Sequence, residues 1–123
     1  MAHVSINNFF SLAMTICLAM SIAMAPPRAQ GAITCDFVLR SLSPCLGYLR
    51  RGGSVPPACC AGGRSLFNAV ATTPDLQAGC RCVKILVPNV GANPVYVNSL
   101  PGICGIKIPY KYSPSLDCSK VVR

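Results

Sequence analysis

The sequence contains no glutamate and no tryptophan, and its single histidine is His3. Its acidic side chains are Asp36, Asp75 and Asp117 alone. General acid–base and nucleophilic catalysis depend on positioned histidines, carboxylates or activated nucleophiles. Hydroxyls and lysines remain, but the chain after residue 31 has no histidine, so no catalytic triad can be composed from that part. The composition therefore argues against an enzyme.

Charged side chains are also absent from the first 27 residues. An apolar run over residues 9–25 is followed by two prolines and by Ala29 and Gly31, small residues of the kind a signal peptidase requires. We expect residues 1–31 to be a secretory signal peptide and residues 32–123 to be the mature domain. An uncleaved membrane anchor is the alternative, because the leading region has no Lys or Arg, but the run is short for a bilayer span.

Cleavage would remove His3 and Cys17 and leave 92 residues with a net charge of +7. Eight cysteines remain: Cys35, Cys45, Cys59, Cys60, Cys80, Cys82, Cys104 and Cys118. An even number in a small secreted chain with a thin core indicates a disulfide framework. A zinc site is the alternative, but the mature domain has no C-x-x-C pair and no histidine. The adjacent Cys59 and Cys60 would form a strained bridge, so each must reach a different segment.

Capping and proline signals mark two helices in the first half of the domain. Thr34 can cap a first helix, which Pro44 kinks or ends. One face of this helix is apolar at helical spacing: Val38, Leu42, Cys45 and Leu49. The pair Pro56-Pro57 opens a second helix, because proline is tolerated in a first turn.

Two further helices are expected in the second half. Thr73 can cap the third, with proline and an acidic residue directly after it, and Pro88 should end it near Val87. Asn93 with the following proline starts a short fourth helix that reaches about Leu100. Later prolines should leave the C-terminal tail irregular, pinned by its two cysteines.

The cysteine spacing is C-x9-C-x13-CC-x19-CxC-x21-C-x13-C. It resembles the eight-cysteine framework of the plant non-specific lipid transfer proteins of type 1 over nearly the whole mature domain. Arg81 inside the CxC pair is also typical of type 1. Three further segments support the resemblance: VPPACC at 55–60, TTPD at 72–75 and CGIKIPY at 104–110.

The resemblance implies an all-α fold. It would be a four-helix bundle stapled by disulfides, with an internal hydrophobic tunnel and an irregular C-terminal tail. The resemblance also implies four disulfide pairs: Cys35–Cys82, Cys45–Cys59, Cys60–Cys104 and Cys80–Cys118.

Two family motifs near the ligand are present with departures. In the T/S-x-x-D-R/K motif, Leu76 replaces the final cation, and in the P-Y-x-I-S motif, Tyr112 replaces isoleucine. Tyr110 matches the tyrosine whose hydroxyl faces the lipid head group in the family. We expect nine lipid-binding residues: Val38, Leu42, Leu66, Val70, Asp75, Leu76, Val83, Leu86 and Tyr110. The alternative is that the apolar residues are ordinary core, and that Asp75 is only a charge at a helix start.

The basic residues of the mature domain are spread along the chain, in runs of at most two. Nucleic acid is therefore not an expected partner, whereas attraction to an anionic membrane surface suits a carrier that docks to collect lipid. We expect a secreted monomer of the extracellular space or cell wall, without metal or cofactor. It would move the acyl chains of fatty acids or phospholipids between membranes or to the cell surface. The alternative is a defence protein of the same superfamily that is antimicrobial or inhibits a digestive hydrolase.

Overall fold

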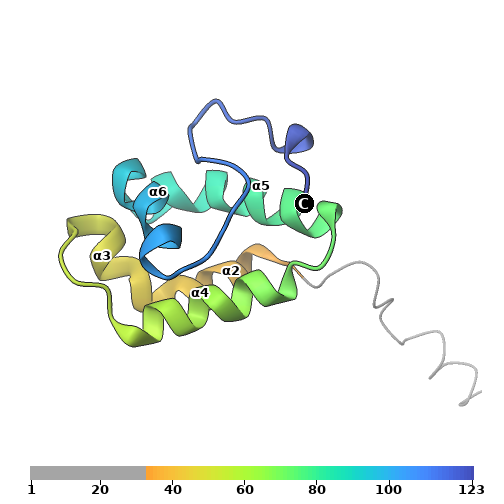
Figure 1. Ribbon diagram of the computed structural model, residues 1–123. Coiled ribbons are helices and arrows are strands. Elements are labelled where there is room, and N and C mark those ends of the chain that lie inside the picture. The colour runs from red at the N-terminus through yellow and green to blue at the C-terminus, as the bar shows by residue number, and fades with distance from the viewer. Residues whose placement is uncertain (1–32) are drawn as a thin grey trace, which may run out of the picture. The chain divides into compact units, whose positions relative to one another are not determined.

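The computed structural model describes residues 33–123 (Figure 1), so the expected signal peptide lies outside the described residues. The helices are α2 (Cys35–Leu42), α3 (Leu46–Arg51), α4 (Pro57–Ala69), α5 (Thr73–Asn89) and α6 (Pro94–Ile103), with short 3-10 turns η1 (Ser43–Cys45) and η2 (Cys118–Lys120). Residues 33–123 contain no β-strand, which confirms the all-α prediction. None of these helices is long and apolar enough to cross a membrane.

The first predicted helix is kinked at Pro44, as expected. The Thr34 hydroxyl oxygen accepts a hydrogen bond from the Phe37 N–H at 3.1 Å and caps α2. Pro44 lies in η1, and α3 continues the chain directly after it. Because proline cannot donate a main-chain hydrogen bond, the chain tightens locally and then resumes as a helix.

The cap of α5 is Thr72, so the prediction of Thr73 is wrong by one residue. Thr72 has an extended backbone, and its hydroxyl accepts from the Asp75 N–H at 3.2 Å. Thr73 is already the first helical residue. A capping side chain accepts from an N–H two or three residues later, and Thr72 makes that bond with Asp75 from its extended backbone just before the helix.

The helices α5 and α6 both extend further toward the C-terminus than the sequence predicted. α5 runs past Pro88 to Asn89, and α6 runs past Pro101 to Ile103. A proline in a last turn removes a single N–H, and the turn can still close around it. Val90 N–H donates to the Leu86 carbonyl at 2.9 Å, which closes the end of α5.

The helices pack around two clusters of buried residues. α2 contacts both α4 and α5, α3 contacts α6, and η2 contacts α5. One cluster comprises Ile33, Val38, Val70, Leu76, Cys80, Cys82, Cys118 and Val121. The other comprises Cys45, Tyr48, Leu49, Cys59, Leu100 and Cys104. Leu42 packs against both clusters, so the C-terminal end of α2 joins the two parts of the core.

Four disulfides connect these elements: Cys35–Cys82, Cys45–Cys59, Cys60–Cys104 and Cys80–Cys118. They form the pairing that the family resemblance implies. The neighbours Cys59 and Cys60 tie α4 to η1 and to the end of α6, respectively. Each bridge contributes about 2–4 kcal/mol, so the four together rival the whole stability of an ordinary domain.

The chain after α6 is irregular, as predicted. We call residues 105–117 the C-terminal strap; they form the extended coil that passes α5 in Figure 1. The Ile106 N–H donates to the Pro101 carbonyl at 2.8 Å at one end of the strap. At the other end the Lys84 ammonium donates to the Leu116 carbonyl at 2.6 Å, and Cys118 is bridged to α5.

Candidate functional site

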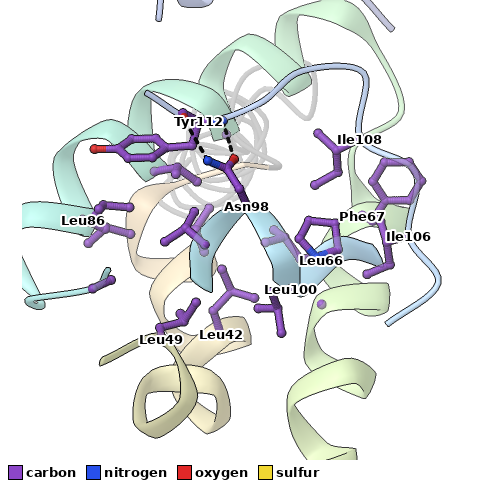
Figure 2. Close-up of a pocket in the computed structure, with 18 of the residues that line it drawn as sticks. Leu42, Leu49, Leu66, Phe67, Leu86, Asn98, Leu100, Ile106, Ile108 and Tyr112 are labelled. Carbon is purple, nitrogen blue, oxygen red and sulfur yellow. Dashed lines mark hydrogen bonds between the residues drawn. The ribbon is translucent and has the colours of Figure 1, made fainter. Parts of the chain in front are cut away.

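A cavity of about 180 Å³ lies among the helices and the strap. Its wall includes apolar side chains from α2, α3, α4, α5 and α6, and Figure 2 shows Leu42, Leu49, Leu66, Leu86 and Leu100 around the space. None of the described residues that line it carries a charge. Its side-chain hydrogen-bonding groups come from one asparagine and two tyrosines. Such a lining suits a hydrocarbon ligand, because it offers apolar contact and few polar constraints.

Eight of the nine predicted site residues line this cavity: Val38, Leu42, Leu66, Val70, Leu76, Val83, Leu86 and Tyr110. Three of them also belong to the buried core, since Val38, Val70 and Leu76 are 1%, 6% and 5% exposed. The two alternatives for these positions, core or wall, are therefore not exclusive. One side of each residue packs against its neighbours while another borders the empty space.

Asp75 is the predicted site residue that the structure places outside the cavity wall. Its carboxylate accepts from the Ala71 N–H at 3.2 Å, while its own N–H donates to the Thr72 hydroxyl. These bonds satisfy main-chain N–H groups at the start of α5, where a negative charge is also favourable. The geometry thus matches the alternative role of a helix-start charge.

The rest of the wall was not predicted from the sequence. Leaving aside its glycines and bridged cysteines, fourteen residues were missed: Leu39, Leu46, Leu49, Phe67, Val87, Val90, Ala92, Val97, Asn98, Leu100, Pro101, Ile106, Ile108 and Tyr112. The sequence of the strap did contain a pattern that could have predicted its wall residues. Every second residue from 106 to 112 lines the cavity, while those between them are exposed. An extended chain turns alternate side chains to one face, so alternation of apolar and other residues would have identified this wall.

Tyr110 lines the cavity and is partly buried. Burial raises the pKa of its hydroxyl above the ordinary tyrosine value, because an apolar environment disfavours the phenolate. The hydroxyl therefore stays protonated across the physiological range. It can donate or accept a hydrogen bond to a ligand but cannot supply a charge.

Two hydrogen bonds join the Asn98 side chain to the main chain of Tyr112 beside the cavity (Figure 2). The Asn98 side-chain N–H donates to the Tyr112 carbonyl at 2.9 Å, and the Tyr112 N–H donates to the Asn98 side-chain oxygen at 2.7 Å. Both residues line the cavity, and Tyr112 is 9% exposed. A side chain of α6 thus holds the main chain of the strap.

Cations lie near the cavity but outside its wall. The Lys84 ammonium donates a hydrogen bond to the Leu116 carbonyl. The Arg123 guanidinium lies 5.6 Å from the ring centre of Phe67, a wall residue. Leu76, at the position where the resembled family has a cation, is buried in the apolar core. Within residues 33–123 there is also no group of three side chains that could hold a metal ion.

Comparison with known proteins agrees with this architecture. Residues 35–118 match the model of the protease inhibitor/seed storage/LTP family. A non-specific lipid-transfer protein of Helianthus annuus is 47% identical over 109 residues, covering 88% of this chain and 94% of the relative. Non-specific lipid-transfer protein 1 of Prunus dulcis is 50% identical over 111 residues, covering 89% and 92%.

A solved structure of non-specific lipid transfer protein 1 from barley, in complex with L-α-lysophosphatidylcholine, superposes with a TM-score of 0.69 at 32% identity. It covers 72% of this chain and 99% of the barley chain. Other similar structures are complexes with phospholipid, prostaglandin B2 and palmitate. The cysteine framework, the helical fold and these similarities show that the chain belongs to the non-specific lipid-transfer proteins of the protease inhibitor/seed storage/LTP family.

Proposed function

We propose that this protein takes the acyl chains of fatty acids or phospholipids into its cavity and carries them between membranes or to the cell surface. The observation that carries the proposal is the cavity wall, to which every α-helix contributes apolar side chains and in which none of the described residues is charged. The ligands held by the similar barley and wheat proteins support the same ligand class.

Broad specificity follows from the physics of such a wall. Burial of each methylene contributes about 0.8 kcal/mol, or about a fourfold gain in affinity, whatever the head group. Affinity should therefore rise with chain length until the cavity is full. The phospholipid, prostaglandin and palmitate complexes of similar proteins fit a site that recognises hydrocarbon first.

Head-group recognition should be weak in this chain. A guanidinium at position 76 would offer an anionic head group a charge-assisted hydrogen bond, and Leu76 offers none. Tyr110 provides a neutral hydroxyl, whose net contribution is about 0.5–1.5 kcal/mol. Free fatty acids and their uncharged esters should then bind with similar affinity.

Secretion is part of the proposal. Four disulfides in a small domain are typical of oxidising compartments, and residues 1–31 have the composition of a signal peptide. We expect a monomer that is released to the extracellular space or cell wall and touches membrane surfaces transiently. Sequencing of the N-terminus of the secreted protein should begin at Ala32, and recovery of an intact N-terminus in membranes would support the anchor instead.

The direct test is displacement of a fluorescent fatty acid by three competitors of equal chain length: a fatty acid, its methyl ester and a lysophospholipid. We expect comparable affinities for all three. A strong preference for the free acid would show that a nearby cation recognises the head group, while the carrier function would stand. Absence of binding by any of them, combined with liposome leakage or hydrolase inhibition, would favour the defence role.

A further inference from the structure

The C-terminal strap covers one side of the cavity with four side chains. Ile106, Ile108, Tyr110 and Tyr112 all line the space. The strap has no regular secondary structure, so no ladder of main-chain hydrogen bonds holds it to the helices. Movement of this segment away from α6 would expose the cavity on that side.

Few attachments hold the middle of the strap. Its ends are fixed by the bond from Ile106 to Pro101 and by the bond from Lys84 to Leu116. Between these points, the pair with Asn98 is the sole hydrogen-bonded attachment of the strap to a helix among the described residues. Remaining hydrogen bonds in this stretch join residues of the strap to one another, as between Ser113 and Leu116.

Asparagine is chemically suited to this position. Its amide presents one acceptor and two donors on a short side chain, so it can satisfy both main-chain groups of a single residue. Tyr112 needs that partner, because its main chain lies beside an apolar wall where an unpaired N–H or C=O is unfavourable. The closed position of the strap is therefore stabilised by one side chain, at the point where the strap meets the cavity.

We infer that Asn98 is a positioning residue. Its two hydrogen bonds to Tyr112, which we call the latch, hold the strap against α6 and thereby set the rate at which lipid enters and leaves the cavity. The inference rests on the proposed function, since it requires that the cavity exchange acyl ligands. Both hydrogen bonds of the latch join protein atoms only, so we expect them to form with and without a ligand. Its loss should therefore lower the barrier to entry and to exit together, with little change in the equilibrium affinity.

The test compares Asn98→Ala with Asn68→Ala. Asn68 is an exposed asparagine of α4 that does not line the cavity, so its replacement reproduces the change in helix propensity without touching the latch. Stopped-flow measurements with cis-parinaric acid give the association and dissociation rates. For Asn98→Ala we expect both rates to rise about tenfold, as the loss of two hydrogen bonds allows, with the dissociation constant changed less than about twofold. Asn68→Ala should leave both rates unchanged.

A second measurement reports on the latch without a ligand. Amide hydrogen exchange at Tyr112, followed by NMR, should quicken about tenfold in Asn98→Ala, while the amides in the centre of α5 keep their protection. Unchanged exchange at Tyr112, or unchanged lipid rates in a variant that still binds the probe, would overturn the latch and leave the carrier function intact. A raised dissociation constant with slower association would show a merely structural role and also overturn it. Failure of the unmodified protein to bind the probe would remove the proposed function and this inference together.

Discussion

Gly62 of α4 lies directly against the main-chain carbonyl oxygen of Ser41 in α2. A Cβ atom at position 62 would overlap that oxygen, so the two helices can approach this closely because residue 62 has no side chain. Glycine weakens a helix, and the sequence alone shows only that disadvantage. The close approach brings the walls contributed by Leu42 and Leu66 to the same cavity.

Replacement of Gly62 by alanine should therefore destabilise the protein, although alanine is the better helix former. We expect a loss of about 1–3 kcal/mol, because neither backbone can move away without disturbing the packing. Gly102→Ala is the matched control, since a Cβ there meets nothing within 4 Å and Gly102 lies within α6. The Gly102→Ala variant should have a free energy of unfolding about 0.5–1 kcal/mol higher than that of the unmodified protein. Denaturant unfolding of both variants provides the comparison, and equal effects of the two would contradict the contact.

Residues 33–123 should contain no free thiol, because the structure pairs all eight of their cysteines. Thiol titration of the secreted protein in denaturant, without reductant, should find none. A stoichiometric signal would show that one bridge is missing.

Full reduction should abolish the fold. Each bridge contributes about 2–4 kcal/mol, and a domain with a hollow interior has little packing to replace them. Circular dichroism after reduction should show loss of most helix and no cooperative melting. A reduced protein that kept its helices and melted cooperatively would show that packing alone sustains the fold.

Val83→Phe should weaken the binding of long acyl chains. Val83 lines the cavity from α5, and a larger ring there would occupy space equivalent to about two methylenes of ligand, which corresponds to about a tenfold loss of affinity. Val95→Phe is the control, since Val95 is 69% exposed and lies at the start of α6, outside the wall. Displacement assays with palmitate and with a shorter fatty acid should show the larger loss for palmitate. Equal affinities in the two variants would mean that the ligand does not reach Val83.

Tyr110 should affect stability at alkaline pH. Its pKa is raised by burial, so the folded protein retains the hydroxyl proton more strongly than the unfolded chain, whose tyrosines ionise near pH 10. This contribution to stability is complete below about pH 10 and is lost as the pH rises through the folded-state pKa. Tyr110→Phe removes the ionisation and should flatten the corresponding part of the decline. Ultraviolet titration should show a late ionisation in the unmodified protein that is absent from the variant, and curves with the same late ionisation in both would contradict the assignment.

Local features of the sequence predicted the helices well. The caps at Thr34 and Asn93 and the kink at Pro44 depend on interactions within a few residues, and all three are present. The errors are also local: the cap at Thr72 was placed one residue late, and two helices were ended before prolines that their last turns tolerate. The cysteine spacing identified the family, and through that resemblance the fold and the disulfide pairs.

The sequence by itself thus determined the helical segments, the number of bridges and the family, because these depend on residue type and on spacing along the chain. Tertiary structure alone decided which apolar residues border the cavity, where Asp75 lies and which side chain holds the strap. The Asn98–Tyr112 pair joins residues 14 positions apart in elements of different conformation, and no periodicity predicts it. A cavity is the space that packed elements leave between them, so its wall is a property of their mutual arrangement and is not encoded in the pattern of any one segment.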